Sequence, residues 1–178
     1  PVLKTNVAMI YDPENKKVIY EKNSNLRRSL ASITKLMTAI VFLETDPDFE
    51  KIVTMEDSDL PRPETGVKIA VNVGDQITVR DLFNAMITGS ANNAALALAR
   101  STGLSAAEFT ARMNKRAKDL QMMSTNFVEP TGLNPDNIST VTDISLMVNY
   151  IMKRPGVITA SIQPSYTYTI INTGEKRT

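Results

Sequence analysis

One helix is expected at the centre of this chain, over the segment Leu30-Ala-Ser-Ile-Thr-Lys-Leu-Met-Thr-Ala-Ile-Val-Phe-Leu-Glu44. Its apolar side chains recur at the three- and four-residue spacing of a helix, which predicts one broad face buried in a core. These positions are Ile33, Leu36, Met37, Ile40, Val41 and Leu43. Ser32 and Lys35 open the first turn, so the sequence predicts a buried helix with two reactive side chains at its start.

Ser32 and Lys35 are three residues apart, which places them on one helical face and brings the lysine amine within reach of the serine hydroxyl. A neutral lysine in this position can act as the base that activates a serine nucleophile. The start of a helix also offers backbone N–H groups and a positive dipole end to a developing oxyanion. The same spacing occurs where serine is only a helix cap and lysine only a solvated side chain, so the pair alone leaves both interpretations open.

The composition narrows the chemistry that this pair can support. The chain has 178 residues, 42% of them hydrophobic, with no histidine and no cysteine. These counts exclude a Ser-His-Asp triad, a disulfide framework and a zinc site of the usual kind, so a serine hydrolase here would need a lysine base. We expect no metal and no cofactor. The formal net charge of +1 gives no support for nucleic-acid binding, and no apolar run has the length of a membrane span.

Short β-prone runs are expected before and after the central helix. Residues 6–11 and 17–21 flank a turn that contains proline and asparagine, which predicts a hairpin. Pro47 cannot continue a helix, so the central helix should end before it. Residues 51–55 and 67–71 are expected to form further short extended segments.

A second polar motif, Ser90-Ala-Asn92, falls between two expected helices. Thr78 and Asp81 resemble a capping box at the start of a helix that Gly89 should stop, and an alanine-rich helix is expected over residues 93–100. Unused polar groups are costly in a loop between buried helices. The motif is therefore a candidate part of a functional site.

The rest of the chain predicts two longer helices and a final hairpin. Ser105 and Glu108 resemble a capping box before an amphipathic helix, and residues 142–153 form another amphipathic pattern that Pro155 should stop. Residues 166–171 alternate as in a strand and lead into a turn at Asn172-Thr-Gly174. We find no internal repeat, and the length of 178 residues predicts one domain or two tightly packed subdomains.

Ser32-Ile-Thr-Lys35 followed by Ser90-Ala-Asn92 resembles the first two motifs of the penicillin-binding proteins and serine β-lactamases. Other segments are similar to the low-molecular-mass D-alanyl-D-alanine peptidases, and within that family to the periplasmic D,D-endopeptidase branch. These segments are Ala8-Met-Ile-Tyr-Asp12, Lys17-Val-Ile-Tyr-Glu-Lys22, Ala31-Ser-Ile-Thr-Lys-Leu-Met-Thr38 and Phe127-Val-Glu-Pro-Thr-Gly-Leu133.

The resemblance implies an α/β (α+β) fold of the serine β-lactamase and D,D-peptidase type, in which a helical subdomain packs on an antiparallel sheet. Within one domain over residues 1–178, the hairpin and lead-in would take residues 1–31. The helical subdomain with the site would take 32–162, and the C-terminal sheet would begin over 163–178. The resemblance also implies an exported enzyme of the periplasm or cell envelope. Its partners would be D-alanine-containing peptidoglycan peptides, cleaved as an endopeptidase or carboxypeptidase, and β-lactams that acylate it.

The resemblance also implies a role for each candidate site residue. Ser32 would be the nucleophile, neutral Lys35 its base, Ser90 a proton relay to the leaving amine, and Asn92 a residue that holds Lys35 and the substrate amide. Burial or a nearby positive charge would have to lower the pKa of Lys35 for this role. Ser124-Thr-Asn126 is a second match to the Ser-x-Asn pattern. We assign it to a structural loop because Ser90 has the position between helices.

The third motif of the family, Lys-Thr-Gly on a strand beside the site, does not occur, and Asn172-Thr-Gly174 lacks the lysine. In the family this strand follows the point at which the chain ends. We therefore expect that the chain supplies only part of the sheet and lacks its C-terminal strands. The hairpin of residues 6–21 should then have an uncovered edge and apolar face, which favours self-association or a second polypeptide that completes the sheet.

Two other functions stay open at this point. A β-lactamase is one, because Glu129-Pro-Thr-Gly-Leu-Asn134 is similar to the loop in which a glutamate positions the deacylating water. Its spacing is one residue longer than that pattern, which favours a structural loop carboxylate for Glu129. A non-catalytic fragment that binds peptidoglycan or penicillin without turnover is the other, and the missing third motif favours it.

Overall fold

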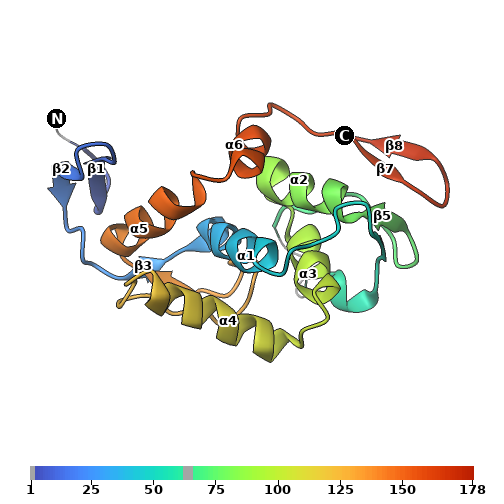
Figure 1. Cartoon of the computed structure of the whole chain (residues 1–178), viewed down its shortest axis with the longest axis horizontal. Helices are drawn as coiled ribbons and strands as arrows, with labels where there is room; N and C mark the ends of the chain where they lie inside the picture. Colours follow the sequence, from blue (N-terminus) through green and yellow to red (C-terminus); the bar gives the residue numbers. More distant parts are fainter. Residues whose placement is uncertain (1–2, 62–65) are drawn as a thin grey trace.

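The computed structural model describes residues 3–61 and 66–178. The segment around Ser32 forms a short 3-10 turn, η1 (Ala31–Ile33), that runs into α1 (Thr34–Leu43). Eight residues of α1 are buried, and Figure 1 shows this helix in the middle of the molecule. The helix ends ahead of Pro47, as the sequence predicts. Ser32 itself precedes the α-helix and lies in the 3-10 turn.

Helices surround α1 and supply most of the core. They are α2 (Val79–Gly89), α3 (Asn92–Ser101), α4 (Ala106–Asp119), α5 (Val141–Ile151) and α6 (Pro155–Ser161). The first four pack directly on α1. Met37, Leu98 and Met113 are fully buried between them, and each buried side chain of this size contributes about 1.5–3 kcal/mol through removal of apolar surface from water. None of the helices within the described residues is long and apolar enough to cross a membrane.

Local sequence signals account for several helix ends. The Thr78 side chain accepts a hydrogen bond from the Asp81 backbone N–H at the start of α2, and Ser105 and Glu108 form a reciprocal capping box at the start of α4. Pro155 does more than stop a helix: α5 ends at Ile151, and Pro155 is the first residue of α6, where a missing N–H costs nothing.

The strands pair as separate two-stranded antiparallel units. These pairs are β1 (Ala8–Asp12) with β2 (Lys17–Lys22), β3 (Arg28–Ser29) with β6 (Ile138–Ser139), β4 (Ile52–Thr54) with β5 (Gln76–Thr78), and β7 (Tyr168–Ile170) with β8 (Glu175–Arg177). The first and last hairpins agree with the sequence prediction. The architecture is thus α/β, with helices and small antiparallel sheets.

The middle of the chain differs from the strand prediction at two places. Residues 67–71 form no strand, and β5 is a strand that the sequence reasoning missed. The extended segment after Gly66 is held by the Asn93 side chain, which accepts a hydrogen bond from the Ile69 N–H at 3.0 Å and donates one to the Ile69 carbonyl at 2.9 Å. An asparagine amide takes the place of a partner strand here, so these β-prone residues form no strand pair.

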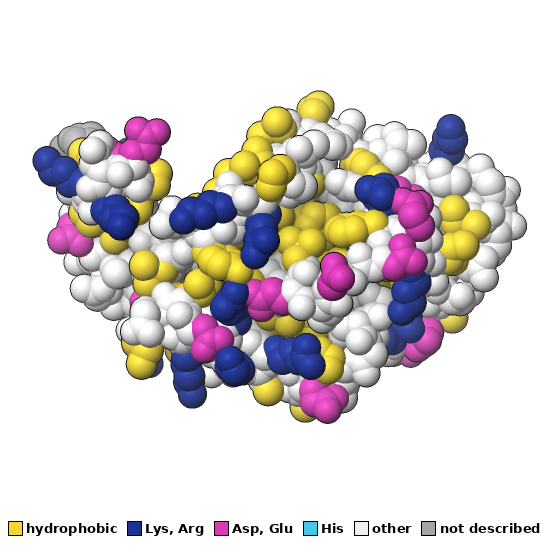
Figure 2. Space-filling view, viewed as in Figure 1, with side chains coloured by type: hydrophobic (Ala, Val, Ile, Leu, Met, Phe, Trp, Pro, Cys, Tyr) yellow, Lys and Arg dark blue, Asp and Glu magenta, His cyan; other side chains and the backbone are white. Residues whose placement is uncertain are grey.

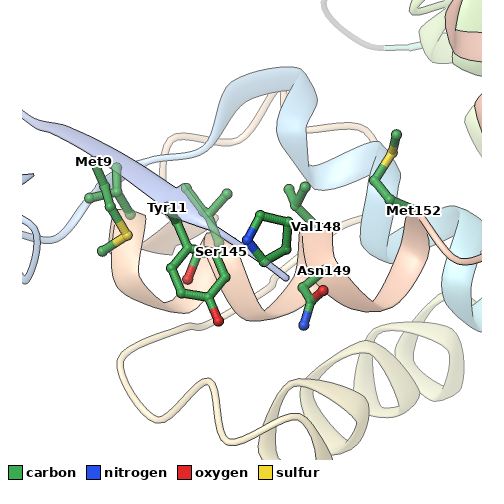
Figure 3. Close-up of a pocket in the computed structure, with 9 residues that line it drawn as sticks. Met9, Tyr11, Ser145, Val148, Asn149 and Met152 are labelled. Carbon is green, nitrogen blue, oxygen red and sulfur yellow. The ribbon is translucent and has the colours of Figure 1, made fainter. Parts of the chain in front are cut away.

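The N-terminal hairpin lies at one end of the molecule, and in Figure 2 a notch separates it from the rest of the face that is drawn. Ile10, Val18 and Ile19 are exposed by 45%, 42% and 63%. A groove of about 350 Å³ runs between β1 and α5. Its labelled lining residues in Figure 3 are Met9, Tyr11, Ser145, Val148, Asn149 and Met152. The hairpin therefore has the exposed apolar surface that the sequence predicts.

Candidate active site

Ser32 and Lys35 are in contact at the start of the central helix. The Lys35 Nζ lies 3.1 Å from the Ser32 Oγ, a distance that allows a hydrogen bond. Ser32 is exposed, whereas Lys35 is only 3% exposed. The serine hydroxyl is thus open to an incoming substrate while the amine behind it is shielded from water.

The Lys35 amine has two further hydrogen-bond acceptors. The Asn92 Oδ1 and the Thr131 backbone carbonyl each lie 2.7 Å from Lys35 Nζ. Together with Ser32 Oγ they use all three donors of an ammonium group. Three segments of the chain therefore meet at this one nitrogen atom.

Burial lowers the pKa of Lys35 from 10.5 to about 8, because the low-dielectric interior disfavours the charged form, while the negative charge of Glu129 acts in the opposite direction. With a pKa of about 8, roughly one molecule in ten carries a neutral Lys35 at pH 7. A neutral amine can accept the proton of the Ser32 hydroxyl. The pair thus has the geometry that general-base activation of a serine requires, and the neutral amine that it needs is a minor form at pH 7.

Asn92 reaches the site from the junction between α2 and α3, which also contains Ser90. Ser90 follows the last residue of α2 with a left-handed φ of 58°, and this sharp change of direction leads directly into α3. Asn92 is the first residue of α3 and is 3% exposed. Its neighbour in space is Gly66, where an added Cβ would lie 2.5 Å from Asn92 Nδ2, so only glycine fits this position.

The structure brings Ser32, Lys35 and Asn92 together and places Ser90 two residues before Asn92. Within residues 3–61 and 66–178, the Ser90 hydroxyl makes no hydrogen bond to Ser32 or Lys35. Its assignment as a proton relay therefore stays a prediction.

The Thr131 carbonyl is a site group that the sequence reasoning did not identify. Thr131 lies in the segment Phe127-Val-Glu-Pro-Thr-Gly-Leu133, which resembles the peptidase family, but its residue type predicts no role in the site. A backbone carbonyl is present at every residue, so residue type alone carries no signal for it. Position in the folded chain, 96 residues after Lys35, is what brings it to the amine.

The second Ser-x-Asn match, at Ser124, belongs to a structural loop, as predicted. The Asp143 Oδ2 accepts hydrogen bonds from the Ser124 N–H at 2.8 Å and from the Thr125 hydroxyl at 2.7 Å. Asn126 pairs through its backbone with Ile138. These contacts attach the loop to the start of α5 and β6.

Glu129 also has a structural role, as its interpretation as a loop carboxylate predicts. Its carboxylate accepts hydrogen bonds from the backbone N–H groups of Thr131 and Gly132, each at 2.6 Å. Asn137 Nδ2 donates a further hydrogen bond at 2.8 Å. The Glu129 carboxylate thus holds the backbone of the loop that contains it in one conformation.

Known proteins are similar to this chain over most of its length. Residues 1–176 match the family model described as D-alanyl-D-alanine carboxypeptidase. The chain is 36% identical over 151 residues to the D-alanyl-D-alanine endopeptidase of Haemophilus influenzae, covering 84% of this chain and 51% of the relative. It is 33% identical over 150 residues to the D-alanyl-D-alanine carboxypeptidase DacF of Bacillus subtilis, covering 82% of this chain and 38% of the relative.

A solved structure has a similar fold. A mutant of the DD-transpeptidase of Streptomyces K15 superposes with a TM-score of 0.91 at 28% identity, over 99% of this chain and 72% of that one. The chain spans about half the length, or less, of the curated relatives named above.

Proposed function

Because the chain belongs to the D-alanyl-D-alanine carboxypeptidase family, we propose that it carries the catalytic residues of a serine D,D-peptidase that acts on D-alanine-containing peptidoglycan peptides. The observation that supports this most directly is the 3.1 Å contact between Lys35 Nζ and Ser32 Oγ, with the lysine buried and the serine exposed. In this proposal Ser32 is the nucleophile and Lys35 the base, Asn92 orients Lys35, and Ser90 passes on a proton.

Acylation would begin when neutral Lys35 accepts the proton of the Ser32 hydroxyl. The Ser32 Oγ then bonds to the carbonyl carbon of a D-alanine residue, next to the positive end of the α1 dipole, which stabilises negative charge there. As the C–N bond breaks, the proton held by Lys35 passes through Ser90 to the leaving amine. The product of this step is an ester between the D-alanine carbonyl and Ser32.

Deacylation would use a water molecule and the same base. Lys35 accepts one proton of the water as its oxygen bonds to the ester carbonyl carbon, and this proton returns to Ser32 Oγ as the ester C–O bond breaks. A β-lactam would enter by the same acylation step, with its ring C–N bond opened. Peptidoglycan and β-lactams are extracytoplasmic, so the proposal places the protein in the periplasm or cell envelope.

A second function has one observation in its favour. The chain contains no Lys-Thr-Gly motif, which would supply a cationic group to the substrate carboxylate. A fragment that is acylated slowly, or that binds peptidoglycan without turnover, would fit this absence. Catalysis by the chain alone is therefore the first property to measure.

Mass spectrometry after incubation with a penicillin tests the proposal. We expect the mass of the chain to increase by that of one penicillin, with the adduct on Ser32, and we expect no adduct in Ser32→Ala. The proposal would be contradicted if neither the chain nor a version extended through a Lys-Thr-Gly segment formed an adduct. An adduct that is hydrolysed within seconds would instead favour a β-lactamase.

A further inference from the structure

The segment of residues 129–134, called here the Thr131 loop, controls where the third acceptor of Lys35 lies. The Thr131 carbonyl is 2.7 Å from Lys35 Nζ, and both groups are buried. A backbone carbonyl can keep such a position only if the loop around it has one conformation. The groups that fix this loop therefore act on the catalytic amine from a distance.

Glu129 fixes the loop from inside. Its Oε2 accepts hydrogen bonds from the backbone N–H of Thr131 at 2.6 Å and from the hydroxyl of the same residue at 2.5 Å. Its Oε1 accepts them from the Gly132 N–H at 2.6 Å, from Asn137 Nδ2 at 2.8 Å and, at 3.4 Å, from the Asn134 N–H. Hydrogen bonds to an ionised acceptor are about twice as strong as neutral ones, so these five hold the loop closed.

These five donors also exclude one role for Glu129. An ionised carboxylate has about four lone-pair sites. All of them are occupied by donors of the Thr131 loop and Asn137. No site is left to orient a deacylating water, which separates this glutamate from the one in the β-lactamase loop.

The Thr131 loop is also attached to the helix that carries the catalytic pair. The Thr38 hydroxyl donates to the Pro130 carbonyl at 2.6 Å, and Asn137 Nδ2 donates to the Thr34 hydroxyl at 3.2 Å. Gly132 lies so close to Ala31 that an added Cβ would be 1.8 Å from the Ala31 carbonyl oxygen. A shift of this loop would therefore be transmitted to the residue before Ser32.

On the basis of the proposed function, we propose that Glu129 is a positioning residue of the reaction, which shapes the Thr131 loop so that the Thr131 carbonyl directs the Lys35 amine toward Ser32. Glu129 acts through the loop and touches neither Ser32 nor Lys35. Its negative charge has a second effect, because it favours the charged form of Lys35 and so opposes the effect of burial on the lysine pKa. Among the residues that the structure describes, Glu129 is the charged side chain that shifts the pKa of Lys35.

The substitution Glu129→Gln tests this role, because glutamine keeps the shape of the side chain but loses the charge and half of the acceptor sites. Asp136→Asn is the matched control: Asp136 is exposed, follows the same loop, and loses the same charge. Two quantities are measured for each variant and the unchanged chain. The first is the pKa of Lys35, from NMR titration of lysine labelled with 15N and 13C. The second is the rate of Ser32 acylation by a labelled penicillin as a function of pH.

We expect Glu129→Gln to lower the pKa of Lys35 below its value of about 8, since both the negative charge and the well-placed carbonyl acceptor favour the ammonium form. The acid limb of the acylation profile should move to lower pH with it. Acylation at the pH optimum should fall by about 10- to 100-fold, as expected for a misplaced base. Asp136→Asn should change neither quantity.

A Glu129→Gln variant with lower thermal stability but the original Lys35 pKa and acylation rate would overturn the proposal. If that variant does not fold, Thr131→Val removes a single donor to Glu129, and an unchanged Lys35 pKa and rate in Thr131→Val would overturn it equally. The NMR titration keeps this test separate from the proposed function. Absence of acylation in the unchanged chain would count against the D,D-peptidase, while the Lys35 pKa would still decide the role of Glu129.

Discussion

Lys35 joins the three parts of the candidate site, because its amine donates hydrogen bonds to Ser32 Oγ, Asn92 Oδ1 and the Thr131 carbonyl. Ser32 and Lys35 could be paired from the sequence because a three-residue offset at a helix start fixes their mutual distance within narrow limits. Asn92 could be added because a polar loop between two apolar helices is rarely without a function. The Thr131 carbonyl could not, since its approach depends on a loop conformation set by Glu129.

The role of Lys35 as base leads to a prediction about pH. Acylation of Ser32 by a penicillin should rise with pH and reach half of its maximum near pH 8, because only the neutral amine accepts a proton and the pKa of Lys35 is lowered to about 8. Lys35→Ala should abolish acylation and leave the chain folded but less stable, because the buried Asn92 Oδ1 and Thr131 carbonyl each lose a donor, at about 1–3 kcal/mol for each acceptor. Circular dichroism would verify the fold. Acylation of Lys35→Ala at the original rate would show that the base is another residue.

At the scale of elements, hairpins and helices could be predicted where a regular spacing of apolar residues is bounded by a capping or turn residue. The capping residues Thr78 and Ser105 and the turn at Gly174 marked such ends correctly. The strand β5 was missed because three residues beside a helix cap are too few to show a period. The pairing of β3 with β6 joins residues more than a hundred positions apart, and only the tertiary fold specifies it.

The contact between the Thr131 loop and η1 leads to a prediction about stability. Gly132 has a φ of +88°, and an added Cβ would overlap the Ala31 carbonyl. Gly132→Ala should therefore cost about 3 kcal/mol or more in the free energy of unfolding, from backbone strain and steric overlap together. Gly174→Ala is the matched control, because Gly174 has a φ of +72° with nothing within 4 Å of an added Cβ.

Only the cost of the left-handed backbone conformation applies at Gly174, so its substitution should cost about 1–2 kcal/mol. Urea unfolding of the two variants measures both values. Equal costs would show that the close contact between Gly132 and Ala31 does not contribute, and that the Thr131 loop can move away from η1.

At the scale of the whole molecule, the helices bury their apolar side chains more fully than the N-terminal hairpin does. The helices around α1 enclose a core in which Met37 and Phe109 are buried. The hairpin of β1 and β2 pairs with no other strand among the described residues, and Ile19 is 63% exposed on it. A two-stranded hairpin is marginally stable by itself, so further strands beside it would stabilise it.

These observations lead to a comparison of the chain with a version extended through the Lys-Thr-Gly strand of a relative. The added strands should cover the hairpin, and the added lysine should bind the substrate carboxylate, so that interactions with the transition state increase. We expect labelled penicillin to acylate Ser32 much faster in the extended version. Analytical ultracentrifugation should detect association of the shorter chain through its hairpin, and Ile19→Lys should reduce that association by placing a charge on the exposed edge. Equal acylation rates, with a stable monomer for the shorter chain, would show that the helical part alone suffices for acylation.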